Sequence, residues 1–173
     1  MKERGIIFNT EMIRAIHDGR KTQTRRRAQF KPREYGLNLT FSGLKSGNYC
    51  NGSSESGFVL LSMSNGCWSD KTYPLHCPYG KPGEIINFMD IDGNIIGKIE
   101  ILNIRIERLQ SISQEDALAE GAPPSHHSID SVSRLYGFPN FSISWFAQVW
   151  WRMYGKESWY INSWVWVIEF KRV

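Results

Sequence analysis

The chain has 173 residues, which is enough for one domain with a full hydrophobic core and too few for two of ordinary size. Its 41% hydrophobic and 22% charged residues are an ordinary globular composition, and its net charge of +4 suits an anionic partner without requiring one. Three widely spaced cysteines argue against a disulfide framework and fit a reducing compartment. With no signal peptide and no apolar run of membrane length, we expect a cytoplasmic protein that does not enter a membrane.

The first elements expected along the chain are a short strand over residues 6–8 and a helix that Asn9 or Thr10 caps. Gly19 ends this helix, and residues 20–27 read as a second strand. The apolar residues that share one face of the helix are Met12, Ile13 and Ile16.

The most informative segment is the junction Gly-Arg-Lys-Thr-Gln-Thr-Arg-Arg, from Gly19 to Arg26. If all of it were strand, Lys21 would point to the face opposite Thr22 and Thr24. If Lys21 instead lies at the corner between helix and strand, it can fold over a concave site beside a strand hydroxyl. A lysine beside a hydroxyl serves either acyl transfer or the capture of a phosphorylated ligand, and the pattern leaves both open.

This junction opens a basic block that contains no acidic residue before Glu34. Its members are Arg20, Lys21, Arg25, Arg26, Arg27, Lys31 and Arg33. Such a block forms either a solvated basic face or a surface that contacts nucleic acid. The residues that we take as candidates for contact with a substrate or nucleic acid are Arg20, Thr22, Arg25 and Arg26.

Residues 28–80 are rich in Gly, Ser and Asn, and we interpret them as an insertion into a single domain that spans residues 1–173. One hairpin is expected within this insertion, rising over residues 58–63 into a Ser-Asn-Gly turn and returning over residues 67–73. The stretch 42–57 is expected to be a loop.

The second half begins with a turn rich in Pro and Gly over residues 77–83, in which Tyr79 is a candidate for stacking on a base. A strand is expected over residues 84–89. A longer strand is expected from residue 95 to 108, with a bulge near Leu102 and Asn103 where the apolar alternation changes phase.

A capping box from Ser113 to Asp116 opens a short helix that Gly121 closes, and a further helix is expected over residues 142–154. The broad apolar face of that helix consists of Trp145, Phe146, Val149, Trp150 and Met153. Residues 164–171 form the closing strand. About five to six strands with three flanking helices, without regular β-α-β alternation, predict an α+β fold based on a compact mixed β-barrel.

Several of these motifs together resemble an ASCH domain. They are the Gly-Arg-Lys-Thr-x-Thr-x-Arg junction, the Pro-Gly-acid strand entry at residues 82–84, the capped helix from Ser113 to Gly121 and the closing Val-x-Val-Ile-Glu-Phe strand over residues 165–170. Their order and wording most resemble the versions carried by bacteriophages and prophages. The resemblance covers nearly the whole chain apart from the insertion, and it implies a small PUA-like β-barrel of a superfamily associated with RNA.

One branch of the ASCH family consists of amidohydrolases that remove the acetyl group from N4-acetylcytidine. Carried over residue by residue, the resemblance implies that Lys21 is the proton acceptor, Thr24 the nucleophile and Glu120 the proton donor. It also implies a cleft lined by the junction from Gly19 to Arg26. The expected partner is therefore a nucleoside, RNA or single-stranded nucleic acid, bound without a metal or cofactor.

Amide hydrolysis requires a nucleophile, a base and an acid, and a lysine acts as base only if burial or nearby arginines lower its pKa. The alternative is a non-catalytic module that binds RNA or single-stranded nucleic acid, in which Lys21 and Thr24 hold a phosphate without chemistry. A nuclease is a third reading, although it needs more carboxylates than the motif supplies. The spacings of Cys50, Cys67 and Cys77 and of the neighbouring histidines match no zinc-binding pattern.

Overall fold

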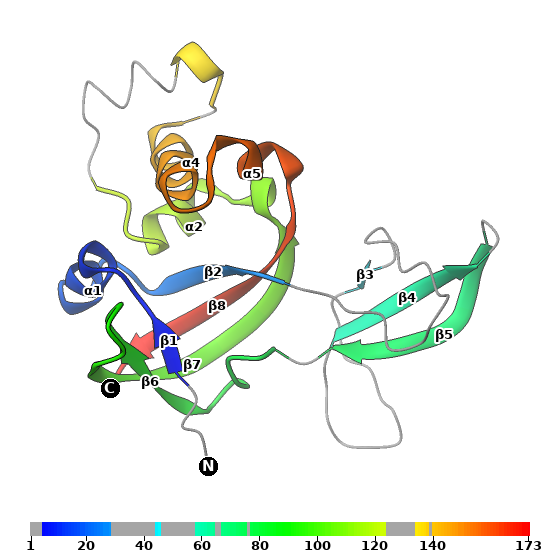
Figure 1. Cartoon of the computed structure of the whole chain (residues 1–173), viewed down its shortest axis with the longest axis horizontal. Coiled ribbons are helices and arrows are strands. Elements are labelled where there is room, and N and C mark those ends of the chain that lie inside the picture. The colour runs from blue at the N-terminus through cyan, green and yellow to red at the C-terminus, as the bar shows by residue number, and fades with distance from the viewer. Residues whose placement is uncertain are drawn as a thin grey trace. The chain divides into compact units, whose positions relative to one another are not determined.

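The computed structural model describes residues 5–28, 44–45, 58–64, 67–75, 77–123, 134–138 and 140–173. The chain divides into two compact units, Met1–Arg27 with Tyr79–Val173 in one and Ala28–Pro78 in the other (Figure 1). The second unit occupies nearly the same residues as the expected insertion. The interpretation of these residues as an insertion into a single domain stays a prediction.

The first unit is built on a five-stranded sheet with the strand order β1-β6-β7-β8-β2. The strands are β1 (Gly5–Ile7), β2 (Gln23–Arg27), β6 (Ile85–Met89), β7 (Ile95–Arg108) and β8 (Trp164–Arg172). β1 runs parallel to β6, and the other neighbours are antiparallel. The bulge expected in the long strand is confirmed by a register shift between Ile101 and Asn103.

The expectation of a closed β-barrel is wrong. β1 and β2 are the two edges of the sheet, and no pairing joins them in the described part of the chain. β1 has only three residues, and the Arg26 side chain of β2 donates to the carbonyl of Ile7 in β1 in place of strand pairing. The fold is therefore a mixed α+β fold around an open sheet.

The helices of the first unit begin and end largely where local signals place them. They are α1 (Thr10–His17), a 3-10 helix η2 (Leu109–Ser111), α2 (Gln114–Ala119), α4 (Phe141–Tyr154) and α5 (Lys156–Ile161). The Asn9 side chain caps α1, and the capping box of Ser113 and Asp116 is confirmed. Helix α5 was not expected, because Gly155 reads as the end of α4 although the chain resumes a helix directly after it.

Figure 1 shows α2, α4 and α5 together on one side of the sheet. They cover Val165 and Val167 of β8, and their own buried residues include Phe146, Trp150 and Trp159. On β8, Ile168 and Phe170 alternate with these valines and are also buried, Phe170 against the ring of Phe8 at 6.0 Å between centroids. Both faces of β8 are therefore covered, which explains its nearly continuous apolar sequence.

The second unit contains a three-stranded antiparallel sheet in the order β3-β4-β5. Its strands are β3 (Leu44–Lys45), β4 (Phe58–Ser64) and β5 (Cys67–Leu75). The expected hairpin is confirmed, and β5 continues two residues beyond its predicted end. The loop expected at 42–57 lies outside the described residues except for β3. Of the helices that the structure describes, none has the length and apolarity needed to span a membrane.

Candidate functional site

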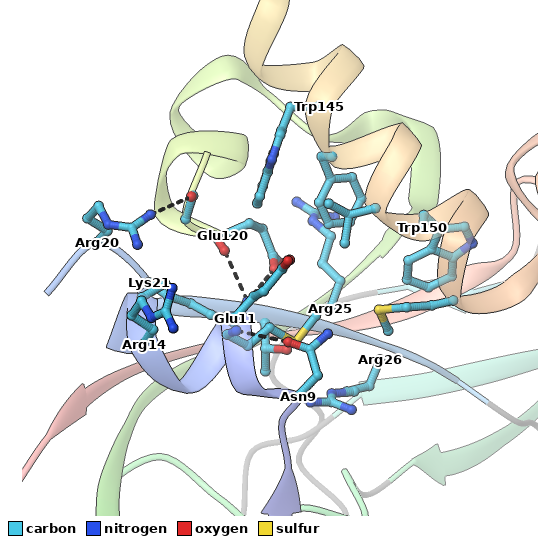
Figure 2. Close-up of a pocket in the computed structure, with 17 residues that line it drawn as sticks. Asn9, Glu11, Arg14, Arg20, Lys21, Arg25, Arg26, Glu120, Trp145 and Trp150 are labelled. Carbon is cyan, nitrogen blue, oxygen red and sulfur yellow. Dashed lines mark hydrogen bonds and ion pairs between the residues drawn. The ribbon is translucent and has the colours of Figure 1, made fainter. Parts of the chain in front are cut away.

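A cavity of about 260 Å³ lies at the β2 edge of the sheet (Figure 2). Its walls come from α1, the junction that follows α1, β2, the end of α2, and α4. The lining residues are Asn9, Glu11, Met12, Arg14, Ala15, Arg20, Lys21, Thr24, Arg25, Arg26, Glu120, Gly121, Trp145, Phe146, Val149, Trp150 and Met153. Ligand pockets commonly have about 300–1,000 Å³, so this one is of a size for a small molecule.

Lys21 lies at the corner between α1 and β2, before the strand begins. The backbone N–H groups of Arg20 and Lys21 both donate to the carbonyl of Ala15, at 2.9 and 3.1 Å. The N–H of Thr22 donates to the carbonyl of Ala119 at 2.8 Å, which ties the corner to the end of α2. Of the two placements considered for Lys21, the structure therefore has the one at the corner between helix and strand. The junction is not a strand over its whole length.

Lys21 and Glu120 form a buried ion pair, with Nζ and Oε2 2.7 Å apart and side-chain exposures of 1% and 4%. Nζ also donates to the carbonyl oxygen of Glu120 at 3.2 Å. Burial lowers the pKa of the Lys21 amine below its ordinary value of 10.5, against the opposing effect of Glu120, and the charge of Arg26 lowers it further. The pKa of Lys21 is thus shifted downward by its buried position, although its partner is an ionisable carboxyl group.

Gly121 makes the close approach of these two residues feasible. Its φ of +106° lies in the region that favours glycine, and it lets the chain turn directly after Glu120. A Cβ at this position would lie 3.3 Å from the Cβ of Ala15 and 3.6 Å from that of Lys21. The end of α2 therefore rests against the corner that carries Lys21.

Thr24 lies on β2 opposite Ile168 and is almost wholly buried, yet it lines the same cavity as Lys21 and Glu120. Within the described part of the chain, its hydroxyl makes no hydrogen bond to either residue. The second carboxylate oxygen of Glu120, Oε1, is buried and has no hydrogen-bond partner among the described residues. Oε1 is thus the carboxylate oxygen that remains after Oε2 has paired with Lys21.

The arginines of the junction have different partners. Arg25 is fully buried and is held by the carboxylates of Glu107 and Asp116, each 3.0 Å away. Arg26 donates to the carbonyl of Ile7 at 2.7 Å and packs over the ring of Phe8. Arg20 donates to the carbonyl of Gly121 and to Asp18, both at 3.2 Å.

The structure thus brings Lys21, Thr24 and Glu120 into one cavity together with Arg20, Arg25 and Arg26. Two other candidates lie elsewhere. Thr22 is exposed, Tyr79 is half-buried, and neither lines the cavity. A contact of these two residues with a substrate or nucleic acid stays a prediction.

The contribution of α1 to the cavity was not predicted, and α4 was predicted only as a helix with a broad apolar face. Asn9, Glu11 and Arg14 line the cavity from α1 and its cap. The apolar face predicted for α4 has two functions, because Phe146 and Trp150 are buried in the core while the same face lines the cavity. Figure 2 shows Trp145 reaching from α4 toward Glu120. The sequence did contain a signal for this second function of α4. Its apolar face has more large side chains than one layer of the core accommodates.

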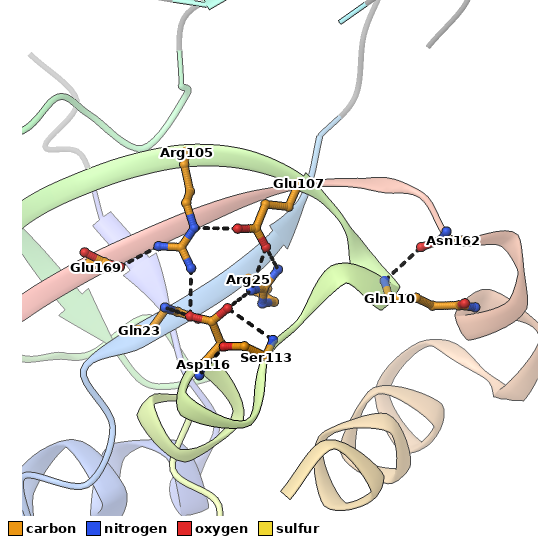
Figure 3. Close-up of polar contacts among 9 residues, drawn as sticks. All are labelled: Gln23, Arg25, Arg105, Glu107, Gln110, Ser113, Asp116, Asn162 and Glu169. Atoms are coloured by element: carbon orange, nitrogen blue, oxygen red, sulfur yellow. Dashed lines mark hydrogen bonds and ion pairs between the residues drawn. The ribbon is translucent and has the colours of Figure 1, made fainter. Parts of the chain in front are cut away.

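A polar network behind the cavity joins α2 to the sheet (Figure 3). Asp116 is its centre, because Gln23, Arg25 and Arg105 all donate to its carboxylate, at 3.1, 3.0 and 2.7 Å. Arg105 also donates to Glu107 at 2.6 Å and to Glu169 at 2.5 Å. Since Asp116 is on α2, the network fixes the helix whose end carries Glu120.

The charge state of Asp116 follows from these contacts. Burial acts to raise the pKa of its carboxyl group, but the hydrogen bond from Gln23, the capping N–H of Ser113 and the charges of the arginines outweigh burial and lower that pKa to about 2. Asp116 is therefore ionised at neutral pH and neutralises part of the arginine charge beside the cavity.

The fold and the site define an α+β protein with an open mixed sheet and a basic pocket, walled by aromatic residues, at the sheet edge. No family model and no curated protein matches the sequence. Among solved structures, the chain is similar to an ASCH domain from Lactobacillus crispatus JV V101, with a TM-score of 0.46 and 11% sequence identity. The alignment covers 98% of this chain and 79% of that one.

Proposed function

We propose that the pocket binds a pyrimidine nucleoside and hydrolyses an acylated exocyclic amine, as in N4-acetylcytidine. One observation carries the proposal: a buried lysine–carboxylate pair, 2.7 Å between Nζ and Oε2, lines a cavity together with the hydroxyl of Thr24. Base, acid and nucleophile are the groups that amide hydrolysis needs. The sequence resemblance to ASCH amidohydrolases assigns these roles to the same three residues.

The ion pair explains how one site supplies both a base and an acid. Transfer of one proton across the 2.7 Å contact converts the lysinium and carboxylate into a neutral amine and a neutral carboxylic acid. Burial favours the neutral amine of Lys21, since it lowers the pKa of that group. The neutral pair has the protonation states that the reaction requires, and the total number of protons does not change.

In the first half-reaction, neutral Lys21 takes the proton of Thr24, whose oxygen attacks the acyl carbon. The bond from that carbon to N4 breaks, the acid form of Glu120 protonates the departing amine, and an acyl-threonine and cytidine result. The pair returns to its ionic form and can again transfer a proton internally. A water then loses its proton to Lys21 and attacks the acyl-threonine, Glu120 protonates the Thr24 oxygen, and acetate is released as its acid.

The direct test follows the release of cytidine from N4-acetylcytidine by the purified full chain. Thr24→Val keeps the shape of the side chain but removes the hydroxyl, so we expect the turnover rate to fall by at least about 100-fold. Thr10→Val is the matched control, since Thr10 is exposed and outside the cavity, and it should retain the rate. Absence of turnover by the unaltered protein would overturn the enzymatic proposal.

A non-catalytic nucleic-acid-binding module is the second candidate function. It is favoured by the cationic residues that line the cavity, which include the exposed Arg14 and Arg20. This reading predicts salt-sensitive binding of single-stranded RNA that Thr24→Val leaves unchanged, without any turnover. Only Glu11 and Glu120 supply carboxylates to the cavity among the described residues, which disfavours a nuclease.

A further inference from the structure

The edge of the cavity carries a cationic group that the proposed hydrolysis does not use. Arg14, on α1, lines the cavity with an exposed side chain, and its guanidinium makes no ion pair or hydrogen bond with any residue that the structure describes. Arg20 makes two hydrogen bonds, to Gly121 and Asp18, and a guanidinium has further N–H donors beyond these. Both residues can therefore donate to a ligand.

Arg14 and Arg20 lie at the same end of the cavity. Ala15 follows Arg14 in α1, and its carbonyl accepts the backbone N–H groups of Arg20 and Lys21. Figure 2 shows both arginines on the side of Lys21, away from Trp150. Two exposed arginines thus line the cavity on the side of Lys21.

The other positive charges of the cavity are already committed. Lys21 is paired with Glu120, Arg25 with Glu107 and Asp116, and Arg26 with the carbonyl of Ile7 and the ring of Phe8. The partner of Arg20, Asp18, is about half exposed, and such surface pairs are weak. The positive charge available to a ligand is therefore concentrated on the rim formed by Arg14 and Arg20.

We propose that this rim binds a phosphate group on the sugar of the bound nucleoside, so that the ligand is a nucleotide. The inference rests on the proposed nucleoside pocket and names its substrate class more closely. Guanidinium groups bind phosphate oxygens through paired, charge-assisted hydrogen bonds. Glu11 lines the cavity from the same helix and would repel the phosphate, but its carboxylate can accept hydrogen bonds from sugar hydroxyls. The phosphate belongs either to a free nucleoside monophosphate or to a nucleotide within a single strand.

The test is a calorimetric titration of the full chain with three probes in about 50 mM salt, where phosphate contacts are strong. The probes are cytidine, cytidine 5′-monophosphate and a cytidine trinucleotide RNA. None of them carries the acyl group, so none is a substrate for the proposed hydrolysis. We expect the monophosphate to bind at least about tenfold more tightly than cytidine. Arg14→Gln and Arg20→Gln should each remove most of this advantage and leave the affinity for cytidine within about twofold.

Arg152→Gln is the matched control, because Arg152 is an exposed helical arginine that does not line the cavity. It should preserve the full advantage of the monophosphate. Tighter binding of the trinucleotide than of the monophosphate would support a site within a strand, and equal binding would support a free nucleotide. Equal affinities for cytidine and its monophosphate, or an equal loss in Arg152→Gln, would overturn the phosphate site while leaving the nucleoside pocket intact. No binding of any probe would overturn both.

Discussion

At the scale of single residues, the ion pair of Lys21 and Glu120 couples the candidate chemistry to the stability of the fold. Both side chains are almost wholly buried. Lys21→Met keeps much of the apolar stem but leaves the Glu120 charge without its partner, which typically costs about 3–5 kcal/mol. We expect that loss in the free energy of unfolding measured with urea. The double variant Lys21→Met with Glu120→Gln should lose less, because no unpaired charge stays buried.

Lys98→Met is the control for this comparison, since Lys98 is exposed on β7 and lies outside the cavity. Its effect should stay within about 0.5 kcal/mol, as for most surface substitutions. If Lys21→Met were no more destabilising than Lys98→Met, the pair would contribute nothing to stability. The comparison also shows whether a loss of activity in a Lys21 variant reflects the chemistry or the fold.

The same scale shows how far the site could be predicted. The sequence identified Lys21, Thr24 and Glu120 as candidates because each belongs to a short motif with its own local signal. Arg14 was not, since an exposed arginine on an amphipathic helix looks like any solvated residue until the chain folds. Trp145 and Met153 were predicted only as members of the apolar face of α4 for a related reason. The sequence shows that this face is apolar, but it does not show that the face meets a cavity.

At the scale of elements, α2 is held to the sheet by the carboxylate of Asp116. Its pKa of about 2 lies below the ordinary value of 3.8, so ionised Asp116 stabilises the fold above about pH 4, and this stabilisation is lost as the pH falls toward 2. We expect Asp116→Asn to lower the free energy of unfolding by about 2 kcal/mol at pH 7, in line with hydrogen bonds to charged groups. The difference from the unaltered protein should shrink between pH 4 and pH 2.

Urea denaturation at a series of pH values measures this convergence. Asp92→Asn is the matched control, because Asp92 is exposed in the turn between β6 and β7, and its variant should follow the unaltered protein at every pH. A stability difference for Asp116→Asn that persists unchanged to pH 2 would mean that the carboxylate acts through packing and not through its charge.

The elements themselves were predictable to the extent that their ends are encoded locally. Asn9 and the capping box of Ser113 and Asp116 begin their helices as expected, and the bulge in β7 follows from a phase shift visible in the sequence. The positive φ of Gly155, +88°, is compatible with the end of one helix and the start of another, so the sequence did not reveal α5. The network around Asp116 was not predictable, since it joins residues up to 93 positions apart.

At the scale of the whole molecule, closure of the sheet is the feature that local patterns could not decide. Barrel closure requires pairing between β1 and β2, and the sequence of either strand alone is compatible with an edge position. A side-chain hydrogen bond links the two edges instead, from Arg26 of β2 to the carbonyl of Ile7 in β1 at 2.7 Å. Arg26 also lines the cavity, so a residue at the open edge takes part in the candidate site.

The division of the chain into two units leads to a final prediction. The five-stranded sheet and every residue that lines the cavity belong to the first unit. We therefore expect replacement of residues 29–77 by flexible Gly/Ser linkers of about 10 or about 20 residues to leave a protein that unfolds cooperatively and binds cytidine within about threefold of the full chain. Urea denaturation and calorimetric titration measure the two properties.

If neither linker length gives a cooperative transition, residues 28–78 are part of the folding unit and not an insertion into it. A variant that unfolds cooperatively but no longer binds cytidine would instead show that the second unit contributes to the site.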